Sequence, residues 1–116
     1  MLLEVDVQNH GEHTVVTARG EVDYATSPLL RDTINDLVVD GRIHLVLDFS
    51  EVSFLDSTGL GALIGARRRV HTFKGSLALV FTGDHLRKLF RITNLEKVFT
   101  IHASLDDALP QDARAH

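Results

Sequence analysis

Hydrophobic and polar residues alternate along the chain with two different periods, which predict strands and helices in turn. Near the N-terminus Leu3, Val5 and Val7 alternate with polar residues, as on a strand with one face in water. Turn-forming residues at 9–12 separate this strand from a β-branched run at 14–20. The first twenty residues are therefore expected to form a β-hairpin.

Helices and further strands are expected to alternate over the rest of the chain. The helices are predicted between Ser27 and Gly41 and over 57–71, 84–94 and 104–110, and the strands over 43–49, 76–81 and 98–101. The runs at 43–49 and 76–81 are almost wholly apolar, which is typical of strands covered on both faces in a parallel sheet. We therefore predict a single α/β domain, with a mixed, mostly parallel sheet of about five strands flanked by about four helices.

The helix ends carry their own signals. Ser27 is expected to cap the first helix with Pro28 as its first residue, and Asn94 to end the third helix in the left-handed conformation. Ser104 begins a capping box for the last helix. The domain is expected to cover residues 1–110, and residues 111–116 are expected to be a disordered tail.

Function is expected in the loops that follow the strands, because parallel sheets meet ligands and partners at the carboxyl ends of their strands. The predicted loops there cover residues 21–26, 50–56 and 82–84.

The composition narrows the class of function. Twelve basic against sixteen acidic residues give a net charge of −4, so nothing global attracts the surface to nucleic acid or anionic lipid, and protein partners are favoured. The absence of cysteine excludes disulfides, thiolate nucleophiles and cysteine-bound metals. The first residues lack the basic and apolar regions typical of a signal peptide, and no apolar run approaches about 20 residues. We expect a cytoplasmic protein that neither binds nucleic acid nor enters a membrane.

The stretch FLDSTGLG at 54–61 is the most informative part of the sequence. Gly59, Gly61 and Gly65 fall in or near one predicted helix, where each glycine costs about 1 kcal/mol relative to alanine. Two explanations stay open: the glycines let the helix pack near the sheet, or they let something else approach closely.

Asp56, Ser57 and Thr58 place three polar side chains at the strand-to-helix junction in this stretch. A phosphate on Ser57 would meet the free backbone N–H groups and the positive end of the helix dipole. It would change the surface charge by about −1.5 to −2 near pH 7. Ser57 is therefore a candidate phosphoacceptor.

The chain contains the segments GEVD at 20–23, DFS at 48–50, FLDSTGLG at 54–61 and LFRITNL at 89–95. Together these segments resemble the STAS domain of bacterial anti-sigma factor antagonists, in a resemblance that spans roughly residues 3 to 109. The resemblance implies that Ser57 is the phosphorylated serine, that Asp23 is the loop aspartate beside it, and that Asp56 is the residue before it.

The resemblance also implies a partner-switching module rather than an enzyme, with no catalytic residue, metal or cofactor of its own. Its unphosphorylated form would bind an anti-sigma factor that is also a serine kinase with a histidine-kinase-like ATPase fold, which releases a sigma factor. Phosphorylation of Ser57 would end the binding, and a PP2C-type phosphatase would restore it. The partner-binding residues are then Asp23, Asp56, Ser57, Thr58, Gly59 and Gly61.

The main alternative is a receiver-like signalling domain that accepts phosphate on Asp48, because Asp48 is predicted near the end of a central strand. Receivers keep an acidic pair after the first strand and a lysine after a late strand. Here those positions hold VQN at 7–9 and FTG at 81–83. Architecture alone is weak support for a function.

Other charged residues are weaker candidates for a functional site. Asp23, Asp48 and Asp56 are more typical of caps and turns than of a metal site. The pair His10 and His13 offers two ligands in a turn, which makes a poor metal site. The arginine triplet at 67–69 is either a solvated face or a docking edge for an acidic partner.

Overall fold

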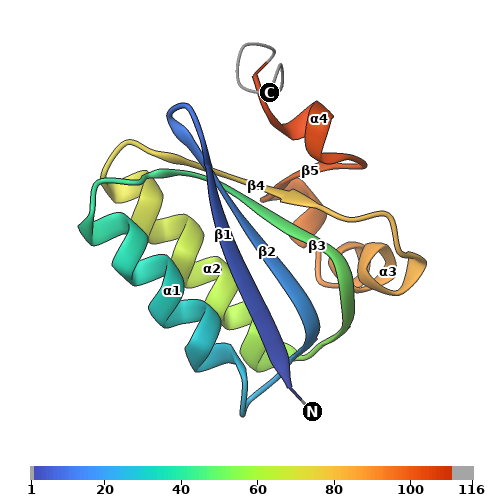
Figure 1. The fold of residues 1–116 in the computed structure, drawn as a ribbon. Coiled ribbons are helices and arrows are strands. Elements are labelled where there is room, and N and C mark those ends of the chain that lie inside the picture. The colour runs from blue at the N-terminus through green and yellow to red at the C-terminus, as the bar shows by residue number, and fades with distance from the viewer. Residues whose placement is uncertain (1, 111–116) are drawn as a thin grey trace.

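The five strands lie side by side in the order in which they occur along the chain, β1-β2-β3-β4-β5. They belong to a computed structural model that describes residues 2–110 (Figure 1). Their bounds are Leu3–His10 for β1, His13–Val22 for β2, His44–Leu55 for β3, Ser76–Val80 for β4 and Thr100–His102 for β5. β1 pairs with β2 in the antiparallel sense and the other pairs are parallel. The predicted hairpin and the mixed, mostly parallel sheet are confirmed.

Within residues 2–110, four α-helices and one short 3-10 helix connect or follow the strands. Their bounds are Ser27–Val39 for α1, Ser57–Thr72 for α2, Asp84–Ile92 for α3, Leu95–Lys97 for the 3-10 helix η1 and Leu105–Ala108 for α4. Buried residues of α1, α2 and α3 join the main core, and Leu109 just after α4 joins a smaller cluster. No helix among residues 2–110 is long and apolar enough to cross a membrane.

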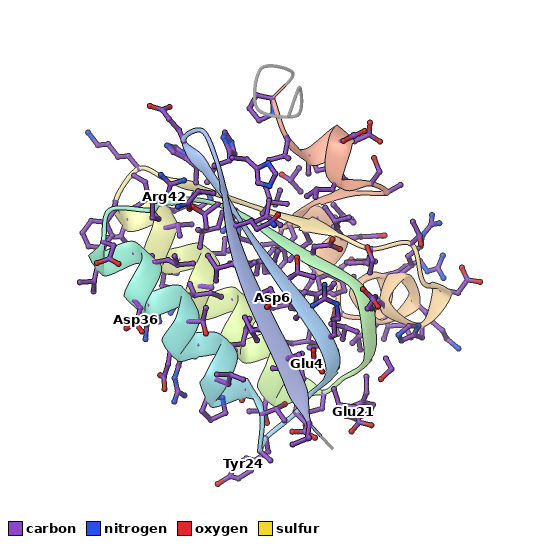
Figure 2. All side chains as sticks on the ribbon, viewed as in Figure 1. Glu4, Asp6, Glu21, Tyr24, Asp36 and Arg42 are labelled. Atoms are coloured by element: carbon purple, nitrogen blue, oxygen red, sulfur yellow. The ribbon has the colours of Figure 1, made fainter. Side chains whose placement is uncertain are left out.

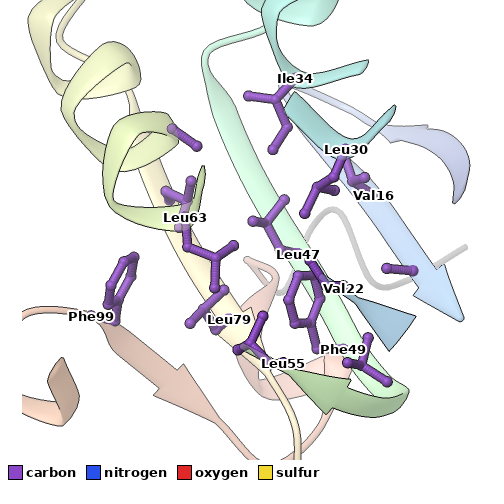
Figure 3. Packing of buried hydrophobic residues seen from close by; sticks show 14 of the residues in the cluster. Val16, Val22, Leu30, Ile34, Leu47, Phe49, Leu55, Leu63, Leu79 and Phe99 are labelled. Atoms are coloured by element: carbon purple, nitrogen blue, oxygen red, sulfur yellow. The ribbon is translucent and has the colours of Figure 1, made fainter. Parts of the chain in front are cut away.

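The central strands are buried on both faces because successive side chains of a strand point in opposite directions. In β3, Leu47 lies in the main core and Val46 lies in the smaller cluster beside α4. Figure 3 shows Leu30 of α1 and Leu63 of α2 over Leu47 in the main core. The apolar run that predicted a central strand is therefore explained by two covered faces.

The predicted loop at 50–56 is wrong, because β3 continues through it to Leu55. The pairing of β2 with β3 shifts register twice on the way, between Thr17 and Arg19 and between Gly20 and Glu21. These irregularities leave Val52 and Leu55 buried, three residues apart, and so break the period of two that marks a strand in the sequence.

The ends of the helices are partly as expected. Ser27 does not cap α1: Thr26 is the cap and Ser27 is the first helical residue. Asn94 adopts the predicted left-handed conformation with φ of 63°. Ser104 caps α4 by accepting a hydrogen bond from the Asp107 N–H at 3.2 Å. The predicted tail at 111–116 lies outside the described residues, and the domain boundary at 110 stays a prediction.

Candidate functional site

Two polar segments meet where β2 and β3 end together. Val22 pairs with Leu55, and the Asp56 N–H donates to the Val22 carbonyl oxygen at 3.2 Å. Asp23 and Asp56, the residues that follow the two strands, therefore lie at the same end of the sheet. Ser57 begins α2 immediately afterwards.

Asp23 fastens the loop between β2 and α1. Its Oδ1 accepts hydrogen bonds from the N–H groups of Ala25 and Thr26, both at 3.0 Å. The N–H of Thr26 is the main cause that lowers the pKa of Asp23 below its ordinary value, and partial burial opposes it. The Thr26 hydroxyl donates to the Glu21 carbonyl oxygen at 2.6 Å. The ionised carboxylate thus holds the loop in one shape.

The same loop presents an aromatic residue that the sequence did not single out. Tyr24 follows Asp23, and the residue is 81% exposed. Figure 2 shows it extending from the end of the molecule where β2 leads into α1. The sequence could have marked Tyr24 as a candidate contact residue, because a large aromatic side chain is unusual inside a polar loop. Phe54, which is 47% exposed, adds a second exposed ring near the end of β3.

Asp56 caps α2 and so fixes where Ser57 lies. The Asp56 backbone is extended, and its Oδ1 accepts a hydrogen bond from the Gly59 N–H at 2.9 Å. Ser57 and Thr58 are exposed in the first turn of the helix. The helix start predicted at Ser57 is confirmed.

The glycines of α2 divide into two kinds. A Cβ at Gly59 would lie 2.4 Å from Leu55 Cδ1 and 2.9 Å from the Val22 carbonyl oxygen, so a larger residue does not fit without a shift. Gly59 is buried and serves the contact between α2 and the strand ends. A Cβ at Gly61 or Gly65 would meet nothing within 4 Å. The fold therefore explains Gly59 and leaves the other two unexplained.

Ser57 is exposed and has no hydrogen-bonded base among residues 2–110. The Oδ1 atoms of Asp23 and Asp56 accept backbone N–H groups instead. A serine nucleophile of an enzyme needs an adjacent base. The described part of the chain also brings together no group of three side chains suited to a metal ion. An exposed hydroxyl of this kind suits modification by another protein.

Asp48 lies elsewhere, and its expected position at the end of a strand is wrong. It pairs with Thr17 and Val80 in the middle of the sheet, and β3 runs on for seven more residues. Its Oδ1 accepts hydrogen bonds from the Ser50 N–H at 3.0 Å and the Ser50 hydroxyl at 2.7 Å. Asp48 therefore lacks the loop setting of a phosphate acceptor that follows its strand.

The histidine pair and the arginine triplet that the sequence analysis considered are not immediate neighbours of Ser57. His10 and His13 pair across the turn between β1 and β2, at the opposite end of β2 from Asp23. Within the arginine triplet, Arg68 is exposed, whereas Arg69 lines a groove between α1 and α2 together with Arg31. The sequence marked the triplet but gave no sign that Arg31 lies beside it.

Comparisons with known proteins agree with this geometry. A family model described as the STAS domain matches residues 4–108. The chain is similar to the anti-sigma-B factor antagonist of Bacillus subtilis (strain 168), with 35% identity over 103 residues that cover 89% of this chain and 94% of the relative. It is 31% identical to the anti-sigma-F factor antagonist RsfB of Mycobacterium tuberculosis, over 92% of this chain and 87% of that protein.

A solved structure supports the same similarity. The crystal structure of an anti-sigma factor antagonist from Mycobacterium paratuberculosis superimposes with a TM-score of 0.87 at 33% identity. The match covers 97% of this chain and 95% of that one, so the whole arrangement of strands and helices is shared.

Proposed function

Because the chain belongs to the STAS domain family, we propose that it is an anti-sigma factor antagonist whose binding is switched off by phosphorylation of Ser57. The similar proteins of Bacillus subtilis and Mycobacterium tuberculosis are anti-sigma factor antagonists. The observation that carries the proposal is the exposed Ser57 at the start of a 16-residue helix, between the fastened Asp23 loop and the Asp56 cap. The protein acts as a regulatory binding protein in the bacterial cytoplasm, and not as an enzyme.

The surface that binds the anti-sigma factor is centred on Ser57. Asp23 and Asp56 flank it, and Thr58 and Gly61 are exposed on α2 beside it. Gly59 contributes indirectly, because its lack of a side chain lets α2 pack closely against the ends of β2 and β3. Exposed Tyr24 and Phe54 supply the aromatic area that interfaces favour.

The partner is a serine kinase with a histidine-kinase-like ATPase fold, and it supplies ATP and Mg²⁺. The Ser57 oxygen attacks the γ-phosphorus of ATP, the bond between that phosphorus and the β,γ-bridging oxygen breaks, and ADP leaves. The hydroxyl proton passes to a base of the kinase and from there to water. The phosphate is tolerated at a helix N-terminus but adds about −1.5 to −2 charge to the binding surface. The complex then separates, and a PP2C-type phosphatase hydrolyses the ester to restore binding.

Two variants of Ser57 test the proposal with the purified cognate anti-sigma factor. Ser57→Ala should bind like the wild type and stay bound when Mg-ATP is added, because it has no hydroxyl to phosphorylate. Ser57→Asp should fold normally but bind weakly, because it adds one charge where phosphate adds nearly two. Ser53→Ala, which changes an exposed serine of β3, is the control and should dissociate with Mg-ATP like the wild type.

Dissociation of Ser57→Ala by Mg-ATP would show that Ser57 is not the switch. The chemistry of the label gives a second check. A phosphoserine survives hydroxylamine, whereas an acyl phosphate on Asp48 does not. A hydroxylamine-sensitive label that persists in Ser57→Ala and vanishes in Asp48→Asn would overturn the proposal.

A further inference from the structure

A groove of about 270 Å³ between α1 and α2 lies beside the proposed switch and has no role in the fold described above. Thr58, the neighbour of Ser57, lines one end, and Arg69 lines it three turns further along α2. From α1, Ser27 and Arg31 complete its walls. The groove thus joins the surface already proposed to bind the anti-sigma factor.

The two arginines of this groove have few hydrogen-bond acceptors among residues 2–110. Ser27 is only 4% exposed and lines the groove. The Nη1 atom of Arg69 is buried and has no partner in the described part of the chain. Arg31 has only a 3.7 Å contact with its exposed neighbour Asp32. Because buried polar groups in proteins are normally hydrogen-bonded, the unpartnered Arg69 and the weakly paired Arg31 point to an acceptor from outside the domain.

Two of the residues that line the groove are glycines, which add no side chain to fill it. They are Gly61 and Gly65, and neither would meet another atom within 4 Å if it carried a Cβ. Each glycine also makes the helical conformation of α2 less favourable than alanine would. Since packing within the domain does not require them, their use is the close approach of another chain.

We propose that the groove receives an aspartate or glutamate side chain of the anti-sigma factor, held by Arg31 and Arg69; this rests on the proposed function. Two guanidinium groups without acidic partners in the groove require a negatively charged acceptor, and a planar carboxylate matches the arginine fork. A protein segment is favoured because Thr58 and Gly61 belong both to the groove and to the proposed interface.

This arrangement also suggests how phosphorylation of Ser57 would weaken binding of the partner. A phosphate on Ser57 lies one residue from Thr58 at the mouth of the groove. Its charge repels the carboxylate that the partner must insert there. The arginine triplet also divides: Arg69 belongs to the docking site, and Arg68 remains a solvated side chain.

A matched pair of variants tests the proposal with the purified anti-sigma factor in the absence of ATP. Arg69→Gln should weaken binding at least tenfold and reduce its dependence on salt, because it leaves the inserted carboxylate with one guanidinium fewer. Arg31→Gln should act in the same direction. Arg68→Gln, its neighbour with the same charge, should bind within about twofold of the wild type. Equal losses for Arg68→Gln and Arg69→Gln would overturn the proposal.

Gly65→Ala provides a test that does not alter charge. Its added methyl group should raise the melting temperature, because helix propensity improves and nothing is crowded, and it should weaken binding at least fivefold by filling part of the groove. Normal binding by Gly65→Ala would show that the groove is not occupied in the complex. If the wild type binds no anti-sigma factor, the proposed function itself fails. If the wild type binds but the arginine and glycine variants also bind fully, only the docking site fails.

Discussion

Replacement of Gly59 by alanine tests the assignment of the glycines in α2, because it asks whether the fold or the partner needs this position. The new Cβ would stand 2.4 Å from Leu55 Cδ1, 2.9 Å from Val22 Cγ1 and 2.9 Å from the Val22 carbonyl oxygen. The leucine methyl can rotate away, but the carbonyl belongs to the strand end that also accepts the Asp56 N–H. The first turn of α2 must therefore move.

The size of the effect follows from two opposing contributions. Overpacking of a well-filled contact costs about 1 to 3 kcal/mol. Alanine gains at most about 1 kcal/mol over glycine in a helix, and less in the first turn, where Gly59 lies. The free energy of unfolding should therefore fall by about 1 to 2 kcal/mol. For a chain of 116 residues, each kcal/mol lowers the melting temperature by roughly 3 to 6 °C.

Urea and thermal unfolding, followed by circular dichroism, measure this difference. Gly61→Ala is the matched control two residues away, because its Cβ meets nothing within 4 Å. It should raise the free energy of unfolding by up to about 1 kcal/mol. The two alanines should thus shift stability in opposite directions. If Gly59→Ala is as stable as the wild type, or both variants are equally stabilised, the assignment of Gly59 to the fold is wrong.

Two carboxylates of the site give further predictions. Asp56→Ala should lower the free energy of unfolding by about 1 kcal/mol in urea, because the Gly59 N–H loses its capping acceptor, and an unchanged midpoint would contradict the cap. For Asp23 the folded pKa lies below the unfolded value near 3.8, so its contribution is present above that value and is lost as the pH falls through the folded pKa. The stability difference between the wild type and Asp23→Ala should hold from pH 7 to pH 5 and shrink as the pH is lowered below 3.8; a difference that grows as the pH falls would refute this cause.

Periodicity alone was enough for most of the fold. The alternation from Leu3 and the doubly apolar run at 43–49 identify strands because burial on one or two faces leaves a direct trace in the sequence. The second half of β3 left no such trace. Two register shifts set its buried residues Val52 and Leu55 out of step with a period of two. Ser27 was misassigned as a cap because the pair with Pro28 fits either position at a helix start.

The site was predictable where it is local in the chain. Asp56, Ser57 and Gly59 form one motif, and their spacing specifies a capped helix start. The groove was not predictable, because Arg31 and Arg69 come from different helices that the sheet brings together. A sequence also gives no sign that a buried guanidinium atom lacks an acceptor, since that depends on every neighbour in space.

The position of Ser57 also explains why the proposed switch must act on the partner and not on the fold. A phosphate at the first residue of α2 gains about 0.3 to 1 kcal/mol from the helix dipole. Asp56, held beside it by the Gly59 N–H, repels it by an amount of the same order. These two contributions nearly cancel, so the domain stays folded while the charge of its surface changes. The free energy for dissociation then comes from the interface, where the added charge faces whatever acidic group the partner has placed near Thr58.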